Sequence, residues 1–168
     1  MSEPDSTALD ADIDGFIRHL GSERRLSEHT QSAYRRDLER LKQFLMDLGI
    51  ARWQDVSAPR ARTFPARLHQ SGLSGRSIQR KLSSARSFFR YLARENKLKA
   101  NPFDGIRAPK SPRKLPATLN TDETGALVEF HPHTDIDYRD RALLELMYSS
   151  GLRVSEAAGL KLNNLELF

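Results

Sequence analysis

Apolar residues recur every three or four positions through most of the first hundred residues, which is the spacing of one face of an α-helix. The first run ends near Gly21, and its apolar positions are Leu9, Ile13, Phe16, Ile17 and Leu20. Ser27 is a suitable N-cap for a second, longer helix, which we expect to end at Gly49. Its apolar positions are Tyr34, Leu38, Leu41, Leu45 and Leu48. Both runs predict amphipathic helices with one buried face.

Two further helices are expected before residue 99. Ser57-Ala58-Pro59 predicts the start of a third helix with Phe64 and Leu68 facing inward, although Pro65 removes a backbone donor from it. Ser74 is a suitable N-cap for a fourth helix, whose apolar positions are Ile78, Leu82, Ala85, Phe89 and Leu92. Four helices joined by short connections predict a small helical bundle.

Prolines divide the chain into two regions. Residues 99–118 contain four prolines and five Lys or Arg residues, which excludes a helix and predicts an extended linker. This linker either follows a phosphate backbone or is a solvated spacer, and the sequence leaves both open. Beyond it, Thr121-Asp122-Glu123 begins a helix through about Phe130, and Asp137 caps another through Ser149. No run alternates as a strand would, so the expected fold class is all-α. The expected regions are an acidic tail at 1–8, a bundle at 9–98, the linker at 99–118 and a second domain at 119–168.

Charge is distributed unevenly between these regions. Residues 1–23 hold one Arg and six Asp or Glu, residues 24–118 hold twenty-two Lys or Arg and seven acids, and residues 119–168 hold four and nine. The central block therefore has a net charge of +15 between two ends of −5 each. An excess of this size favours a nucleic-acid partner over cations that only solvate helix faces.

The fourth helix carries the most specific basic pattern. Helix positions 0, 4, 7, 11, 14 and 18 fall on one face, opposite the apolar positions, and they are occupied by Arg76, Arg80, Ser83, Ser87, Arg90 and Arg94. No carboxylate lies between the first and last of these residues in the sequence, whereas ordinary surface helices usually mix signs. The small serines allow close approach to a DNA groove, with arginines reaching phosphates or guanine edges. We predict that this arginine–serine stripe binds DNA; the alternative is an ordinary surface helix.

The second helix gives a weaker basic signal, because Asp37 and Glu39 interrupt it. Its polar and basic candidates are Thr30, Arg35, Arg36, Arg40 and Lys42, and we predict DNA contacts for the first three. The aromatic residues nearby are expected in the core and not stacked on bases: Tyr34, Phe88 and Phe89.

The segment Tyr148-Ser149-Ser150-Gly151-Leu152-Arg153-Val154-Ser155-Glu156-Ala157-Ala158-Gly159 contains an arginine in an unusual place. Gly151 follows an apolar helical run and is the residue type that ends helices in the left-handed conformation. A short helix is expected to begin near Arg153, where a cation opposes the helix dipole by about 0.3–1 kcal/mol. Such a cost is typical of a site that holds an anion, and a guanidinium beside backbone N–H groups suits a phosphate.

This segment and the sequence before it resemble the Xer-type tyrosine recombinases of the phage integrase family. Gly151-Leu152-Arg153-Val154-Ser155-Glu156 matches that family's first catalytic arginine box. Other segments resemble the opening and the DNA-facing helix of its core-binding domain, and its interdomain linker: residues 24–30 with 34–38, residues 82–92, and residues 101–102 with 108–110 and 113–116. Trp53 and Asn101-Pro102-Phe103 favour the XerC branch over the XerD branch. The resemblance extends from about Asp12 to Leu167.

The resemblance implies a four-helix, SAM-like core-binding domain followed by the helical N-terminal part of a catalytic domain. It also implies site-specific DNA recombination, in which a tyrosine attacks the scissile phosphate and frees a 5′ hydroxyl without ATP, metal or another cofactor. Arg153 would neutralise charge on the non-bridging oxygens in the transition state. Glu156 either braces that guanidinium or is a plain first-turn carboxylate.

The resemblance further implies partners and a biological role. The implied partners are a duplex recombination site and a second, XerD-like recombinase in a heterotetrameric synapse. The implied role is DNA recombination and integration, with resolution of chromosome dimers so that chromosomes segregate at cell division. We expect recombination to take place in the cytoplasm, with no membrane partner.

The family's other catalytic groups lie downstream of the arginine box. They are a lysine on a β-turn, a His-x-x-Arg box, a further histidine or tryptophan, and the tyrosine nucleophile. The sequence ends at Phe168, and Tyr138 and Tyr148 precede the arginine. We therefore expect an N-terminal recombinase fragment that binds DNA weakly and catalyses no reaction. Two other interpretations stay open: a stand-alone short DNA-binding protein, and a helical module that binds an acidic protein.

Several other classes receive no support from the sequence. There is no cysteine, so a disulfide framework and a thiol nucleophile are excluded, which fits a cytoplasmic protein. No run approaches the roughly 18 apolar residues of a membrane span, and the acidic N-terminus is not expected to be a signal peptide. His131-Pro132-His133, with Asp135 and Asp137, superficially suggests a metal site, but a solvated turn is the better interpretation and we predict no metal.

Overall fold

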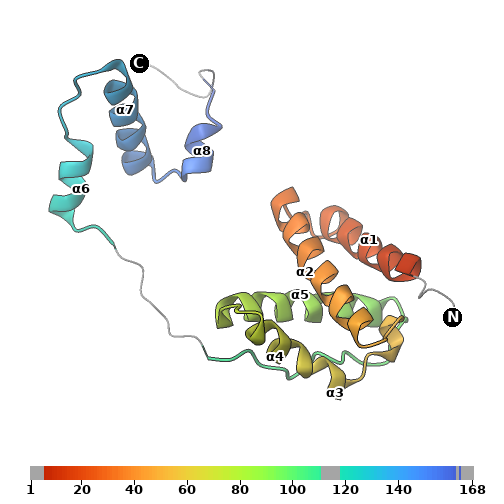
Figure 1. The fold of residues 1–168 in the computed structure, drawn as a ribbon. Helices are drawn as coiled ribbons and strands as arrows, with labels where there is room; N and C mark the ends of the chain where they lie inside the picture. The colour runs from red at the N-terminus through yellow and green to blue at the C-terminus, as the bar shows by residue number, and fades with distance from the viewer. Residues whose placement is uncertain (1–5, 111–117, 162, 164–168) are drawn as a thin grey trace. The chain divides into compact units, whose positions relative to one another are not determined.

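The fold is described from a computed structural model, which describes residues 6–110, 118–161 and 163 (Figure 1). Within these residues all regular structure is helical, which confirms the all-α fold class. The chain divides into two compact units, Met1–Arg113 and Lys114–Phe168, and each is described by itself. None of the described helices is long and apolar enough to cross a membrane.

The first unit is a bundle built on three long helices. Its elements are α1 (Ser6–Ser22), α2 (Glu28–Asp47), the 3₁₀ turn η1 (Trp53–Asp55), α3 (Ala58–Ala61), α4 (Thr63–Gln70) and α5 (Gly75–Arg94). Helix α5 packs against α1, α2 and α4, and α1 also packs against α2 (Figure 1). The predicted N-caps are confirmed, because the Ser27 hydroxyl accepts the N–H of Thr30 and the Ser74 hydroxyl accepts the N–H of Ser77.

The single helix predicted from Ser57 is wrong, because the structure has two helices there, α3 and α4. They meet at Arg62, so Pro65 lies in the first turn of α4 and not in a helix interior. The first-turn N–H groups of a helix have no intrahelical partner, and a proline there costs no hydrogen bond. The break therefore accommodates a residue that a continuous helix would not.

Aromatic rings fill the centre of the bundle. Phe88 lies between Trp53 and Phe16, with ring centroids 4.8 and 5.5 Å away. Phe89 contacts Phe103, with ring centroids 5.1 Å apart. Both α5 phenylalanines are fully buried, and Tyr34 packs against the same core while half-buried, so the three aromatic residues are core residues as predicted.

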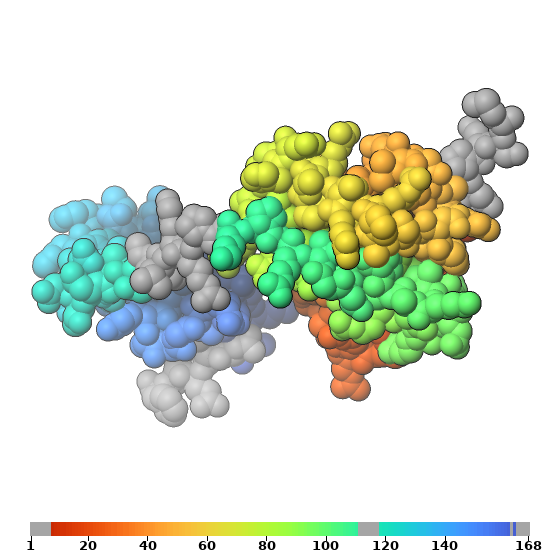
Figure 2. All heavy atoms as spheres, turned by 90° about the horizontal axis from the view of Figure 1, so that it is seen from below, coloured from red at the N-terminus to blue at the C-terminus, as the bar shows by residue number. Residues whose placement is uncertain are grey.

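The first part of the predicted linker is packed onto the bundle. Phe103 is fully buried and Ile106 nearly so. The Asn101 side chain donates to the backbone carbonyl of Arg86 and accepts the N–H of Phe103. This segment runs along α3 and α4 (Figures 1 and 2). Residues 111–117 of the predicted linker lie outside the described residues.

The second unit contains α6 (Thr121–Val128), α7 (Asp135–Ser150) and α8 (Val154–Ala158). Helix α6 ends two residues before the predicted Phe130. The prediction that Asp137 is the N-cap of α7 is wrong: Thr134 is the N-cap, and Asp137 lies three residues later in a capping box. Its carboxylate accepts the backbone N–H groups of His133 and Thr134, so it stabilises the same helix end from inside the first turn.

Candidate nucleic-acid interface

The arginine–serine stripe lies on the open face of α5. The opposite face is buried, and its buried residues are Ile78, Leu82, Ser84, Ala85, Phe88, Phe89 and Leu92. Five stripe residues are exposed and Ser87 is half-buried. A shallow hollow lies over the first half of the stripe, lined by Arg76, Ser77, Gln79, Arg80 and Ser83. The stripe is thus accessible to a large ligand, and its contacts with DNA stay predictions.

A buried carboxylate anchors one arginine of this stripe. Asp37 of α2 is 2% exposed and accepts hydrogen bonds from Arg80, Lys81 and Ser84 of α5. The Lys81 and Ser84 donors lie 2.8 and 2.9 Å from the carboxylate oxygens. Two cations and a hydroxyl therefore compensate the cost of burying this negative charge. Although no carboxylate lies between Arg76 and Arg94 on α5, the charge of Arg80 is compensated, because Asp37 of α2 supplies a carboxylate.

The structural role of Asp37 was missed by the sequence interpretation, which treated it as an interruption of a basic surface. A signal was present: Asp37 is next to Leu38 and four residues before Leu41, so it falls on the apolar face of α2. A carboxylate on such a face needs a buried partner. Which partner it has cannot be read from helix spacing, because Arg80 is 43 residues away.

The acidic residues of α1 neutralise other cations of the bundle. Asp10 pairs with Lys42 of α2, Asp14 with Arg35 of α2 at 2.7 Å, and Asp12 with Lys97 beyond α5. The acidic N-terminal region is therefore folded against the basic block from α1 onward.

These pairs change the acid–base properties of two lysines. Burial alone lowers the pKa of Lys42, but hydrogen bonds to Asp10 and Glu39 outweigh it and raise the pKa overall. The hydrogen bond to Asp12 raises the pKa of Lys97. Both lysines stay charged at neutral pH, with that charge directed to α1 and to neighbouring carboxylates.

The remaining candidate residues of α2 and α5 differ in how far carboxylates compensate them. Thr30 is half-buried beside the Ser27 hydroxyl, and Arg35 is paired with Asp14. Within the described part of the chain, five arginines of α2 and α5 have no carboxylate partner: Arg36, Arg40, Arg76, Arg86 and Arg90. Arg86 is half-buried and its Nε donates to the backbone carbonyl of Leu82, so the other four are the exposed ones. Uncompensated guanidiniums gain most from a phosphate, so these four are the strongest candidates for contact with a nucleic-acid backbone.

The predicted arginine motif folds as expected. Gly151 has φ 66° and ends α7 in the left-handed conformation, and Arg153 is the N-cap residue of α8. The Arg153 guanidinium donates to Glu156 Oε1 at 3.0 Å, and the Arg153 backbone N–H donates to Oε2 at 2.8 Å. Glu156 therefore braces the guanidinium and caps the helix at the same time.

These contacts also set the ionisation of Glu156. The backbone N–H of Arg153, and secondly its guanidinium, lower the pKa of the Glu156 carboxyl. The Arg153 side chain is 81% exposed, so the guanidinium remains accessible beside this carboxylate. Tyr138 and Tyr148 are also exposed, on α7.

The histidine loop before α7 has a capping function. His133 presents its backbone N–H to Asp137, whose pKa is lowered by the N–H groups of His133 and Thr134. Within the described ranges, no group of three or more His, Cys, Asp or Glu side chains is arranged to hold a metal ion.

Two family profiles match this sequence. The profile described as "Phage integrase, N-terminal SAM-like domain" matches residues 13–96, and "Phage integrase family" matches residues 117–168. The first match spans the bundle from α1 to the end of α5, and the second spans α6 to α8.

Two curated relatives of this chain share one name. The chain is 48% identical over 158 residues to "Tyrosine recombinase XerC" of Pseudomonas aeruginosa (strain LESB58), covering 94% of this chain and 52% of that protein. It is 40% identical over 161 residues to "Tyrosine recombinase XerC" of Escherichia coli O157:H7 (strain EC4115 / EHEC), covering 96% and 54%. The chain thus spans about half the length of the curated relatives it matches.

The fold also has a solved counterpart. The Tn1549 transposon integrase, in complex with a circular intermediate DNA, matches with a TM-score of 0.69 at 20% identity. The match covers 94% of this chain and 49% of that one. At this level of identity the likeness shows a shared fold.

Proposed function

Because this chain belongs to the phage integrase family, we propose that it supplies the DNA-binding bundle and the first catalytic arginine of a site-specific tyrosine recombinase. The recombinase is of the XerC type, and it cuts and rejoins duplex DNA through a phosphotyrosine intermediate. Its role is to resolve chromosome dimers in the cytoplasm before cell division.

The open face of α5 is the observation that carries this proposal. From Arg76 to Arg94 the face extends about 27 Å, at 1.5 Å per residue, which is long enough to follow a DNA groove. Arg76 and Arg90 have no carboxylate partner among the described residues, and exposed Ser83 lies between them. We propose that both arginines bind phosphates, that Arg80, Ser83, Ser87 and Arg94 complete the interface on α5, and that Thr30, Arg35 and Arg36 extend it onto α2.

The chemical step is proposed for the whole recombinase. A tyrosine hydroxyl attacks the scissile phosphate, the phosphotyrosine bond forms, and the 5′ oxygen leaves as a hydroxyl. Arg153 stabilises the negative charge that develops on the non-bridging oxygens. Glu156 holds the guanidinium in place, because its two oxygens are already engaged by the side chain and backbone of Arg153. A second, XerD-like recombinase completes the synapse.

The proposal is tested by titrating the 168-residue chain onto a 30-base-pair duplex and following fluorescence anisotropy between 50 and 200 mM salt. Release of counterions from DNA makes log affinity fall linearly with log salt, by about 0.9 for each phosphate contacted. We expect a steep slope. Affinity for the duplex no greater than for a neutral polymer at low salt would contradict the proposal.

A matched pair of variants locates the interface. Arg76→Ala with Arg90→Ala should reduce the salt slope by about two, because two phosphate contacts are lost. The control variant, Arg62→Ala with Arg67→Ala at the start of α4 and within it, removes two other exposed arginines that have no carboxylate partner among the described residues. It should leave the slope unchanged. Equal effects of the two changes would assign binding to net charge and not to α5.

The same assay distinguishes DNA binding from the alternative function, a helical module that binds acidic proteins. Polyglutamate carries negative charge without the phosphate spacing of a duplex. We expect it to compete weakly with the 30-base-pair duplex at equal charge concentration, and equal competition would favour the protein-binding interpretation.

A further inference from the structure

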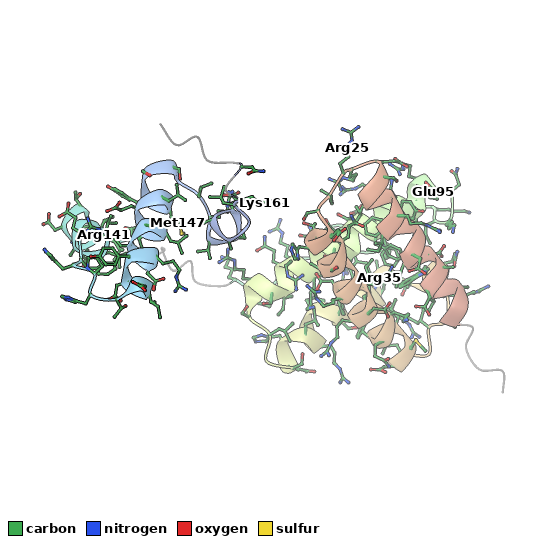
Figure 3. All side chains as sticks on the ribbon, turned by 90° about the horizontal axis from the view of Figure 1, so that it is seen from above. Arg25, Arg35, Glu95, Arg141, Met147 and Lys161 are labelled. Carbon is green, nitrogen blue, oxygen red and sulfur yellow. The ribbon has the colours of Figure 1, made fainter. Side chains whose placement is uncertain are left out.

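A hollow of about 250 Å³ lies between α1 and the last turns of α5. Its polar and charged lining residues are His19 on α1, Arg24 in the turn after α1, and Ser87, Arg90, Tyr91 and Arg94 on α5. It therefore continues the arginine–serine stripe across to α1. Figure 3 shows the neighbouring Arg25 pointing away from the helices at this end of the bundle.

The floor of the hollow is an aromatic platform. The ring of Tyr91 stacks on the ring of His19, with centroids 5.3 Å apart. The Arg94 guanidinium lies 5.9 Å from the centre of the same Tyr91 ring and within hydrogen-bond distance of His19. His19 and Arg94 are thus held side by side, with nitrogen atoms available to one acceptor.

In the structure, the acceptor beside His19 and Arg94 is a carboxylate of the chain itself. Glu23 Oε2 lies 3.0 Å from His19 Nδ1 and 3.7 Å from Arg94 Nη2. Glu23 is the first residue after α1, and its side chain is 65% exposed, so it can leave without disturbing the core. Glu95 approaches Arg94 from the end of α5, at 3.9 Å. The other two guanidiniums of the hollow, those of Arg24 and Arg90, have no carboxylate partner in the described part of the chain.

We propose that Glu23 occupies a phosphate site, and that a backbone phosphate of bound DNA displaces it. The inference rests on the proposed function, since it assumes that a duplex lies along the stripe. A phosphodiester carries one negative charge, as a carboxylate does, so the exchange at His19 and Arg94 preserves the local charge. The phosphate also gains Arg24 and Arg90, which Glu23 leaves without an acceptor, and this favours the incoming anion.

Glu23 therefore weakens DNA binding in the free protein by competition. An exposed ion pair is worth roughly 0–1 kcal/mol, so its removal should tighten binding by no more than about fivefold. The expected gain in DNA affinity is small because the site is open to water. It should nevertheless depend on the loss of the Glu23 carboxylate at this site and not on the loss of any one negative charge.

The test compares two variants that each remove one negative charge from the bundle. Glu23→Gln should bind the 30-base-pair duplex about three- to fivefold more tightly than the unmodified chain. Asp104→Asn changes an exposed acid in the segment after α5, and no ion pair of Asp104 occurs among the described residues. It should change affinity less than about twofold, since Asp104 does not line the hollow and salt screens its exposed charge.

A double-mutant cycle shows whether the gain acts through Arg94. In an Arg94→Gln background the carboxylate has lost one of its two partners, so Glu23→Gln should now change affinity less than about twofold. An undiminished gain would mean that Glu23 acts by long-range charge, and would overturn the inference. The ¹⁵N shift of His19 Nδ1 in the unmodified chain gives a second measurement: it should move when DNA displaces Glu23, and an unchanged shift at saturation would also overturn it.

The two proposals fail in different ways. If the unmodified chain binds the duplex with a steep salt slope, and Glu23→Gln and Asp104→Asn have equal effects, the phosphate site is wrong and the proposed function stands. If the unmodified chain does not bind the duplex at low salt, the proposed function is wrong, and the phosphate site with it.

Discussion

The two units of this chain are stabilised in different ways. The largest fully buried side chains all belong to the bundle, among them Trp53, Phe16 and Phe64. In the described part of the second unit, the buried apolar side chain is Ala157, and no residue of α6 or α7 is buried. Large apolar side chains are exposed there instead: Leu119, Leu127, Ile136, Tyr138, Leu143, Tyr148 and Val154.

Charged contacts show the same difference. In the bundle, Asp37 reaches Arg80 and Asp12 reaches Lys97, so ion pairs join separate elements. Within the described residues of the second unit, the ion pairs span four positions or fewer, as in Arg141 with Glu145. The bundle is thus held by tertiary contacts, whereas α6 and α7 are defined by local signals, chiefly a capping box on each. Helices gain most of their stability from packing, and the described part of the second unit buries little apolar surface.

The largest expected effect comes from core truncation. Phe89→Ala should lower the free energy of unfolding of the bundle by about 3–5 kcal/mol, because a fully buried ring is removed from a close-packed cluster. Leu127→Ala on α6, where the side chain is 46% exposed, should change stability by about 0.5 kcal/mol or less. Trp53 is the single tryptophan and lies in the bundle. Urea unfolding followed by Trp53 fluorescence therefore measures the loss of stability caused by Phe89→Ala. Similar losses in the two variants would remove the distinction between the units.

The next effect concerns the buried carboxylate. Asp37→Ala should lower the free energy of unfolding by about 3 kcal/mol, because Lys81 and Ser84 lose their acceptor; half-exposed Arg80 places this at the low end of the range for a broken buried pair. Asp47→Ala, at the exposed end of α2, is the control and should stay within about 0.5 kcal/mol. The same urea titration measures both, and a loss under about 1 kcal/mol for Asp37→Ala would show that the network contributes little.

The smallest effect is a pH dependence of helix ends in the second unit. The pKa values of Asp137 and Glu156 are lowered in the fold from ordinary values of 3.8 and 4.5, chiefly by backbone N–H donors. Their stabilisation of α7 and α8 is therefore fully present above those values and is lost as pH falls through the lowered pKa of each. Amide signals of Thr134 and Arg153 should lose protection on acidification, and Asp137→Asn should remove the dependence at Thr134 alone. Protection that is unchanged down to pH 2 would contradict this assignment.

Prediction from sequence succeeded where a feature depends on neighbouring residues. The Ser27 and Ser74 caps, the left-handed Gly151 and the exposed stripe on α5 all follow from residue types a few positions apart. The sequence predicts one helix through Pro65, and this is wrong because the break at Arg62 has no strong sequence marker.

The sequence by itself determined where most helices begin and end, which face of α5 is polar, and that Arg153 begins a helix, because each depends on a repeat of 3.6 residues or on a cap within one turn. Only the tertiary structure decided which cations remain without a carboxylate partner among the described residues. Asp37 and the acids of α1 neutralise Arg80, Arg35 and two lysines from 21 to 85 positions away, and Glu23 covers a hollow formed with a helix far along the chain. Partners at such separations are chosen by how the helices pack, since charge pattern alone allows many pairings.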